Sequence, residues 1–264
     1  MEWSGIIRQE FNEDSMKQKI KSILGEMNIF LGSLEAQRRK DGLIIEIDKL
    51  FDFILTLNGG ENSRSQFKQD IFALMVNKFK QGGYFIEFGA TNGYDMSNTY
   101  ILEKQFDWRG VLAEPAKMWH KNLIKNRNCN IEFDCVWQTT GDCLDFDMVE
   151  DGELSTLSIF SNCDEHAKAR QAKTTYKVNT ISLNDLLDKY GAPKVIDYLS
   201  VDTEGSELDI LTTFDFKKYR FNCITIEHNF TENREKLKFL LEENGYKRVF
   251  KHLSKWDDWY IAKK

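Results

Sequence analysis

The chain has few residues that interrupt regular structure and no excess of positive charge. Two prolines among 264 residues argue against long extended linkers. A net charge of −6 argues against a nucleic-acid partner, because binding to phosphates depends on clustered Lys and Arg. The five cysteines form no CxxC pair, and an odd number does not indicate a disulfide framework. These features predict a reduced protein that does not bind nucleic acid.

Long hydrophobic runs are also missing. No apolar run approaches the roughly 18 residues that a membrane span needs, and the first residues lack the pattern of a secretion signal. The sequence therefore predicts a cytoplasmic protein without a membrane partner. The sequence does contain enough apolar residues to form a core, since 41% of its residues are hydrophobic and 13% are aromatic.

The first part of the chain differs from the rest. Apolar residues recur at three- and four-residue steps over 20–34 and 44–55, which is typical of amphipathic helices. We interpret residues 1–62 as a helical extension that caps the core or forms a homodimer, with a substrate lid as the alternative. Residues 63–264 form the main domain. Within it, the polar stretch at about 139–175 is interpreted as an insertion.

The main domain alternates strand and helix patterns, which predicts an α/β fold with a mostly parallel sheet covered on both faces. Ser182 and Asp185 are spaced as an N-terminal helix cap. The expected helices span 98–106, 115–126, 182–189, 208–214 and 232–244. The expected strands span 84–88, 110–113, 130–137, 195–201, 223–226, 246–250 and 258–262.

Acidic side chains follow the strands of this predicted sheet, at the edge where an open α/β sheet binds its ligand. The residues at these strand ends are Glu87, Glu114, Asp134, Asp202, Glu204, Glu227 and His228. After the first strand the chain reads ExGxxxG rather than the GxGxxG of dinucleotide sites. A carboxylate there would repel a pyrophosphate but suits a ligand with an ammonium and a sulfonium. Glu114, 21 residues after Gly93, is spaced to meet ribose hydroxyls. S-adenosylmethionine (SAM) is favoured over NAD.

Three segments together resemble the FkbM-type SAM-dependent methyltransferase family. They are SQFKQDIF (65–72), FIEFGATNGYDMSNTYILEKQFDWRGVLAEP (85–115) and VIDYLSVDTEGSELDIL (195–211). The resemblance covers about residues 65–262. It implies a class I methyltransferase, Rossmann-like fold: a seven-stranded, mostly parallel sheet with helices on both faces and an antiparallel last strand.

The resemblance also implies roles at the cofactor. Glu87 and the glycine turn would line the methionine end, Glu114 would bind the ribose, and Asp134 with Cys135 would lie near the adenine. The family commonly has Asp where this chain has Glu87. The full set of expected cofactor contacts is Gln66, Asp70, Glu87, Gly89, Ala90, Asn92, Gly93, Ser97, Asn98, Glu114, Pro115, Asp134, Cys135 and Asp202.

Methylation of a hydroxyl needs a base or a metal ion, because a sugar hydroxyl has a very high pKa. The candidate catalytic residues are Asp202, Glu204, Glu227 and His228. Asp202, Glu227 and His228 are also candidate ligands for Mg²⁺ or Mn²⁺. Alternatively, His228 acts as the base without a metal. Asp202 as an ordinary turn residue is a further alternative.

The sequence thus predicts a SAM-dependent O-methyltransferase that acts on a sugar, glycan or secondary metabolite. An N-methyltransferase and a non-catalytic methyltransferase-like interaction module remain as alternatives. His120, His166 and His252 are interpreted as surface or packing residues. Trp256 and Trp259 are expected to pack at a sheet edge rather than to stack on a sugar.

Overall fold

The computed structural model describes residues 63–150, 152–163, 165–251 and 254–263. The helical extension expected over 1–62, with its lid or homodimer role, lies outside the described residues, as does His252. Among the helices of the described residues, none has both the length and the apolar character to cross a bilayer.

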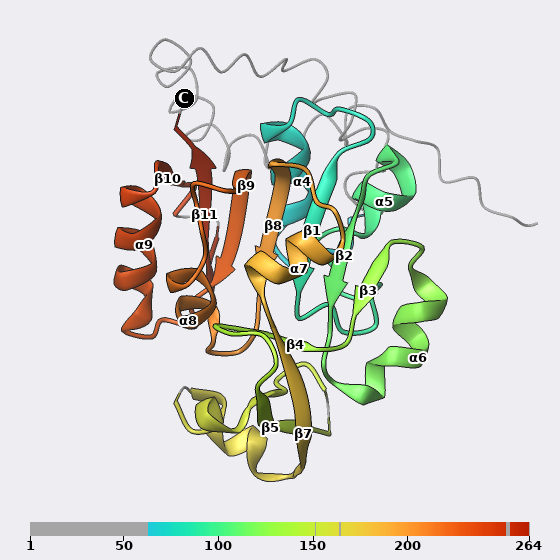
Figure 1. The fold of residues 1–264 in the computed structure, drawn as a ribbon, viewed down its shortest axis with the longest axis vertical. Coiled ribbons are helices and arrows are strands. Elements are labelled where there is room, and N and C mark those ends of the chain that lie inside the picture. The colour runs from blue at the N-terminus through green and yellow to red at the C-terminus, as the bar shows by residue number, and fades with distance from the viewer. Residues whose placement is uncertain (1–62, 151, 164, 252–253, 264) are drawn as a thin grey trace, which may run out of the picture. The chain divides into compact units, whose positions relative to one another are not determined.

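A seven-stranded sheet forms the centre of the fold, in the order β10-β11-β9-β8-β1-β2-β3 (Figure 1). Its strands are β1 (Tyr84–Phe88), β2 (Arg109–Ala113), β3 (Asn130–Glu132), β8 (Val195–Val201), β9 (Arg220–Glu227), β10 (Tyr246–Val249) and β11 (Asp257–Ala262). β1, β2, β3, β8 and β9 pair in parallel. β11 is antiparallel to both β9 and β10, so the sheet is mixed.

Helices cover both faces of this sheet because its strands carry apolar side chains on both sides. In β1, Phe85 and Ile86 are fully buried in two different clusters. The Ile86 cluster includes residues of α7 (Leu183–Lys189), α8 (Glu207–Thr212) and α9 (Asn233–Glu243). The Phe85 cluster includes residues of α4 (Gln69–Val76), α5 (Tyr100–Phe106) and α6 (Lys117–Asn126). The predicted α/β architecture is confirmed.

A second, four-stranded sheet lies beyond the carboxyl ends of the parallel strands (Figure 1). It consists of β4 (Cys135–Trp137), β5 (Cys143–Val149), β6 (Thr156–Leu157) and β7 (Lys173–Ser182). Two short 3₁₀ helices, η1 (Ser158–Phe160) and η2 (Glu165–Gln171), belong to the same region. The single strand expected over 130–137 is wrong, because β3 joins the central sheet whereas β4 joins this second one.

Two local sequence signals for helix ends are confirmed. The Ser182 hydroxyl accepts a hydrogen bond from the Asp185 backbone N–H at the start of α7. Gly245, just beyond α9, has φ 82°, the left-handed conformation that ends many helices.

Candidate active site

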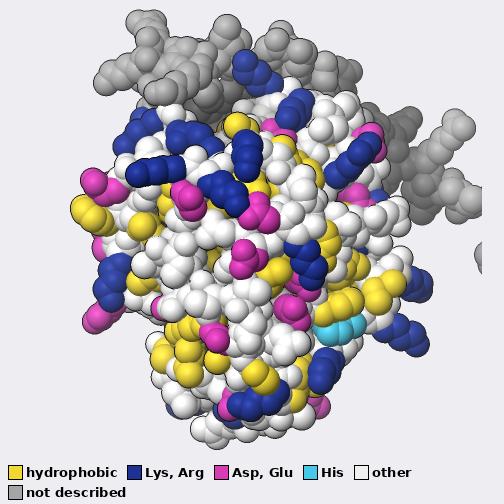
Figure 2. Space-filling model, in the orientation of Figure 1, with side chains coloured by type: hydrophobic (Ala, Val, Ile, Leu, Met, Phe, Trp, Pro, Cys, Tyr) yellow, Lys and Arg dark blue, Asp and Glu magenta, His cyan; other side chains and the backbone are white. Residues whose placement is uncertain are grey.

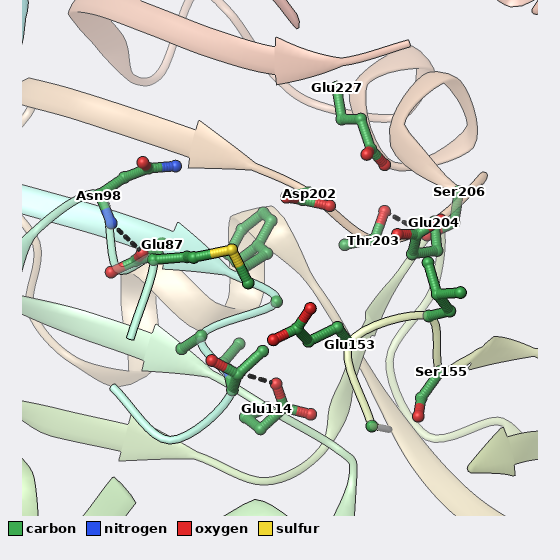
Figure 3. A pocket seen from close by; sticks show the side chains of 18 of the residues that line it. Glu87, Asn98, Glu114, Glu153, Ser155, Asp202, Thr203, Glu204, Ser206 and Glu227 are labelled. Carbon is green, nitrogen blue, oxygen red and sulfur yellow. Dashed lines mark hydrogen bonds between the residues drawn. The ribbon is translucent and has the colours of Figure 1, made fainter. Parts of the chain in front are cut away.

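A cavity of about 310 Å³ opens at the carboxyl ends of the central strands, between them and the second sheet (Figure 3). The ends of β1, β2, β8 and β9 and the start of β11 contribute to its wall. Of the expected site residues, the cavity is lined by Gln66, Glu87, Gly89, Ala90, Ser97, Asn98, Glu114, Pro115, Cys135, Asp202, Glu204 and Glu227. The structure therefore brings most of the strand-end residues into one pocket.

Gly89 lets the turn after β1 approach the turn after β8. Its φ is 70°, and a Cβ placed on it would lie 1.9 Å from the carbonyl oxygen of Asp202. A side chain at this position would be strained by its backbone conformation and would also clash with backbone. The glycine thus fixes the distance between two walls of the pocket.

Glu87 is buried at 3% exposure and anchors the loop that follows the glycine turn. Its carboxylate accepts hydrogen bonds from the Asn98 backbone N–H at 2.7 Å, the Ser97 hydroxyl at 3.1 Å and the Thr99 hydroxyl (Figure 3). Arg127 lies 3.7 Å from the same carboxylate. Burial raises the pKa of Glu87, and Arg127 opposes that shift. The Asn98 side-chain oxygen is buried without a hydrogen-bond partner.

Glu114 holds the glycine turn against the end of β2. Its carboxylate accepts a hydrogen bond from the Thr91 backbone N–H at 2.7 Å and one from the Ala116 N–H at 2.7 Å. Burial raises the pKa of Glu114 to about 7, and the two backbone hydrogen bonds oppose that shift. The side chain lines the cavity (Figure 3).

Asp202 and Glu227 form a carboxyl pair at the ends of two neighbouring strands, β8 and β9. Oxygen atoms of the two side chains lie within 4.8 Å of each other. The interaction between the two carboxyls raises the pKa of Glu227 and lowers that of Asp202. Burial, together with the nearby Asp257, raises the pKa of Asp202 to about 7. Burial and the charge of Asp202 raise that of Glu227 well above its ordinary range. Two pocket-lining carboxyls that influence each other's pKa therefore lie close together at the ends of β8 and β9.

Glu204 lines the same cavity but carries an ion pair. Arg170 Nη2 lies 2.7 Å from Glu204 Oε2, and the Asn229 side-chain amide also donates to that oxygen at 3.3 Å. Asp202, Glu204 and Glu227 are the group of described residues whose oxygens lie close enough to hold a metal ion, within 4.8 Å of one another. The guanidinium of Arg170 already compensates one of these three charges.

The expectation that His228 joins Asp202 and Glu227 as base or metal ligand is wrong. His228 does not line the cavity, and its side chain is 1% exposed. Its Nδ1 accepts a hydrogen bond from the Phe230 N–H at 3.0 Å, and its Nε2 lies 3.8 Å from Asp258. Burial, followed by the charge of Arg234, lowers the pKa of His228 to about 4. The ring packs against that of Phe230, with centroids 5.1 Å apart.

Four expected cofactor contacts also lie outside the cavity lining. Asp70 is fully buried and accepts hydrogen bonds from the hydroxyls of Ser63 and Ser65. Asn92 accepts from the Tyr94 and Asp95 backbone N–H groups within its own turn. The third is Gly93, where a Cβ would meet the side chains of Leu123 and Arg127. The fourth is Asp134, whose backbone N–H donates a hydrogen bond to the Glu132 carboxylate.

Several lining residues were missed from the sequence. The insertion contributes Gly152, Glu153, Leu154, Ser155, Leu157 and His166, and other loops contribute Asn229, Trp256 and Asp257. Glu153 points into the cavity, as Figure 3 shows. His166 was interpreted as a surface or packing residue, although it lines the pocket. Trp256 both lines the pocket and stacks on Phe67, with ring centroids 5.3 Å apart. The aromatic side chain of Trp256 was the only feature of that residue in the sequence that pointed to a role in binding.

An α/β sheet with acid-lined strand ends and a glycine turn is consistent with a SAM-dependent methyltransferase, and a comparison of family models gives the same class. Residues 87–248 match the model described as the methyltransferase FkbM domain. The chain therefore belongs to the FkbM methyltransferase family, and it is a SAM-dependent methyltransferase. Among curated proteins, none matches the chain.

Similar solved structures include three methyltransferases. Methyltransferase FkbM from Methylobacillus flagellatus KT is 12% identical, with a TM-score of 0.41, over 79% of this chain and 58% of that one. Precorrin-6y C5,15-methyltransferase from Geobacter metallireducens GS-15 is 11% identical, with a TM-score of 0.37, over 68% and 71%. A SAM-dependent methyltransferase from Aquifex aeolicus is 10% identical, with a TM-score of 0.35, over 76% and 95%.

Proposed function

We propose that the protein transfers the methyl group of SAM to a hydroxyl of a sugar or glycan, or of a secondary metabolite. The observation that carries this proposal is the Asp202–Glu227 carboxyl pair at the pocket wall. A hydroxyl must lose its proton as it attacks, and a general base works best when its pKa lies near the working pH. The pKa of about 7 for Asp202 meets that condition.

The pocket residues fit SAM. Bound SAM supplies an electrophilic methyl group on a sulfonium. Eight acidic side chains line the cavity, whereas no Lys or Arg of the described residues does, so its lining suits a cationic cofactor. Glu87 and the turn at Gly89 would contact the methionine end, and the unpartnered Asn98 oxygen is available there to accept a hydrogen bond. Glu114 would accept from the ribose hydroxyls, with Cys135 beside the adenine.

The acceptor side has the character of a sugar site. Trp256 offers an aromatic face, 36% exposed, on which the apolar face of a sugar ring can stack. Asn229, Glu227 and Asp257 line the same part of the pocket and supply hydrogen-bond acceptors for hydroxyls. This combination supports a carbohydrate acceptor over an apolar one.

Asp202, paired with Glu227, is the group that we assign as base. Glu204 is less suited to that role because Arg170 holds its carboxylate. The same ion pair and the absence of His228 from the cavity lining argue for proton removal without a metal ion. An amine acceptor needs less help with deprotonation. Transfer that survives Asp202→Asn and Glu227→Gln would therefore favour the alternative, N-methylation.

The cofactor site is tested first, by calorimetric titration of SAM and S-adenosylhomocysteine (SAH). We expect micromolar binding by the wild type and at least a tenfold loss in Glu114→Ala, because the Thr91 N–H of the glycine turn and the Ala116 N–H after β2 both lose their acceptor. Glu243→Ala, an exposed change on α9, is the control. A folded wild type that binds neither ligand would contradict the cofactor assignment.

The acceptor is tested with labelled SAM and a panel of p-nitrophenyl glycosides that differ in the sugar. Transfer to at least one glycoside, reduced at least 100-fold in Asp202→Asn, is the expected result. Transfer to amines alone, or activity that Asp202→Asn leaves unchanged, would contradict the proposal.

A further inference from the structure

The insertion places one fully buried cation beside the pocket. Arg170, on η2, is 1% exposed. Its Nη2 donates to Glu204 Oε2 at 2.7 Å, and its Nε donates to the Leu154 carbonyl oxygen at 2.8 Å. Removing one partner of a buried ion pair is costly, because the other charge then stays buried without compensation. Arg170 therefore joins two pocket-lining segments that are far apart in the sequence.

Glu204 receives a second contact from the insertion through its backbone. Its carbonyl oxygen accepts a hydrogen bond from the Thr156 hydroxyl at 2.9 Å. Its φ is 58°, a left-handed conformation that is uncommon for a residue with a side chain. Such a conformation persists only where its surroundings enforce it. Here the surroundings include Arg170 and Thr156, both from the insertion.

Gly205 provides a third contact, this one by packing. A Cβ on Gly205 would lie 3.0 Å from the Cβ and Cγ atoms of Phe160, which belongs to η1. Phe160 thus packs directly against the backbone of the turn after β8. Three kinds of interaction (an ion pair, a hydrogen bond and an aromatic contact) fasten the insertion to the same turn.

We propose that Arg170 is a positioning residue for the acceptor side of the pocket. Through Glu204 and Leu154 it fixes the loop at 152–155 against the turn at 202–206. That loop lines the cavity, and its Glu153 points inward (Figure 3). The inference rests on the proposed function, in which this wall faces the methyl acceptor. The cofactor side is built at the ends of β1 and β2, around Glu87 and Glu114, away from the ion pair.

Three variants separate positioning from folding: Arg170→Met, Arg170→Lys and the double variant Arg170→Met with Glu204→Gln. We expect Arg170→Met to raise the KM for the glycoside that the wild type methylates at least tenfold. The SAH Kd should stay within threefold, and amide exchange in 152–157 should rise at least tenfold. Arg170→Lys should partly restore the KM, because its ammonium can still reach one of the two oxygens.

The double variant isolates the effect of an uncompensated charge. With Glu204→Gln no carboxylate stays unpaired, so the Tm should recover toward that of the wild type while the KM stays raised. A KM that recovers together with the Tm would mean that Arg170 matters only for stability, and would overturn the inference. A loss of SAH affinity by the same factor as the rise in KM would overturn it as well.

Failure of the positioning role of Arg170 can be distinguished from failure of the proposed function. A wild type that binds SAH but methylates no glycoside would contradict the proposed acceptor class. The positioning role of Arg170 would then be tested by amide exchange in 152–157 alone. Exchange in 152–157 that Arg170→Met leaves unchanged would then overturn the positioning role. Exchange that rises in that segment, with unchanged SAH affinity, would support it.

Discussion

At the scale of single residues, Gly89 makes the most specific demand on the chain. Gly89→Ala adds a methyl group 1.9 Å from the Asp202 carbonyl oxygen, at φ 70°. The left-handed conformation alone costs a residue with a side chain about 1–2 kcal/mol, and the clash adds to that. We expect a lower Tm and at least a tenfold weaker SAH affinity, measured by thermal unfolding and calorimetry.

Gly82 provides a matched control for this change. Its φ is 67°, and a Cβ there would meet nothing within 4 Å. Gly82→Ala therefore carries the conformational strain without the clash. Equal effects of the two substitutions on SAH affinity would show that the close approach at Gly89 is unimportant for the site.

The pKa of Asp202 predicts how stability depends on pH. Folding raises this pKa from an ordinary value of 3.8 to about 7, so the folded state binds the proton more tightly than the unfolded state. The free energy of unfolding should then fall as pH rises from about 4 through 7. Asp202→Asn should remove the part of this loss that Asp202 causes, and at pH 8 it should be more stable than the wild type by at least about 1 kcal/mol.

Urea unfolding of the SAM-free protein at pH 5 and pH 8 measures this difference. The exposed Asp107→Asn serves as a control, and it should leave the pH dependence of the wild type unchanged. An Asp202→Asn variant that loses as much stability as the wild type between the two pH values would contradict a raised pKa at this position.

At the scale of the secondary-structure elements, the sequence predicted what depends on local pattern. Apolar runs ending in acids located β1, β8 and β9, and the ends of parallel strands met at one edge as expected. The prediction for His228 failed for a geometric reason. Successive side chains of an extended chain point to opposite sides, which accounts for Glu227 lining the cavity while its neighbour His228 does not.

Features that depend on contacts between residues far apart in the sequence could not be predicted from local pattern. β3 and β4 follow each other within 130–137, yet they join different sheets because β4 pairs with β7, about forty residues later. The ten-residue strand β7, which begins at the end of the polar insertion, was not predicted. Arg170 and Glu204 are 34 residues apart, and nothing in the local pattern links them.

The neighbouring ends of β8 and β9 also allow a prediction about metal ions. They bring three carboxylates together, but Arg170 compensates Glu204, and no imidazole of the described residues joins the group. We therefore expect that EDTA changes the rate of methyl transfer by less than twofold, and that added Mg²⁺ or Mn²⁺ does not raise it. A rate lost with EDTA and restored by either ion would show that the carboxylates hold a metal during catalysis.

At the scale of the whole molecule, the charge of the pocket differs from that of the surface. On the face shown in Figure 2, Lys and Arg side chains are interspersed with Asp and Glu and are numerous in its upper half. Eight acidic side chains line the cavity, and no basic one does among the described residues. Arg170 compensates Glu204 and the raised pKa of Glu227 favours its neutral form, but the other acidic side chains keep the lining negative, so an acceptor that carries a phosphate would meet repulsion.

We expect this repulsion to select among acceptors. For a p-nitrophenyl glucoside and its 6-phosphate, kcat/KM should be at least tenfold lower for the phosphorylated compound. The difference should shrink as salt rises from 0.05 to about 1 M, because the Debye length falls to about 3 Å at the higher concentration. A pair with a methyl ether in place of the phosphate controls for size, since a neutral group there should not show the salt dependence. A preference for the phosphorylated acceptor would contradict this repulsion and would change the acceptor class proposed for this enzyme.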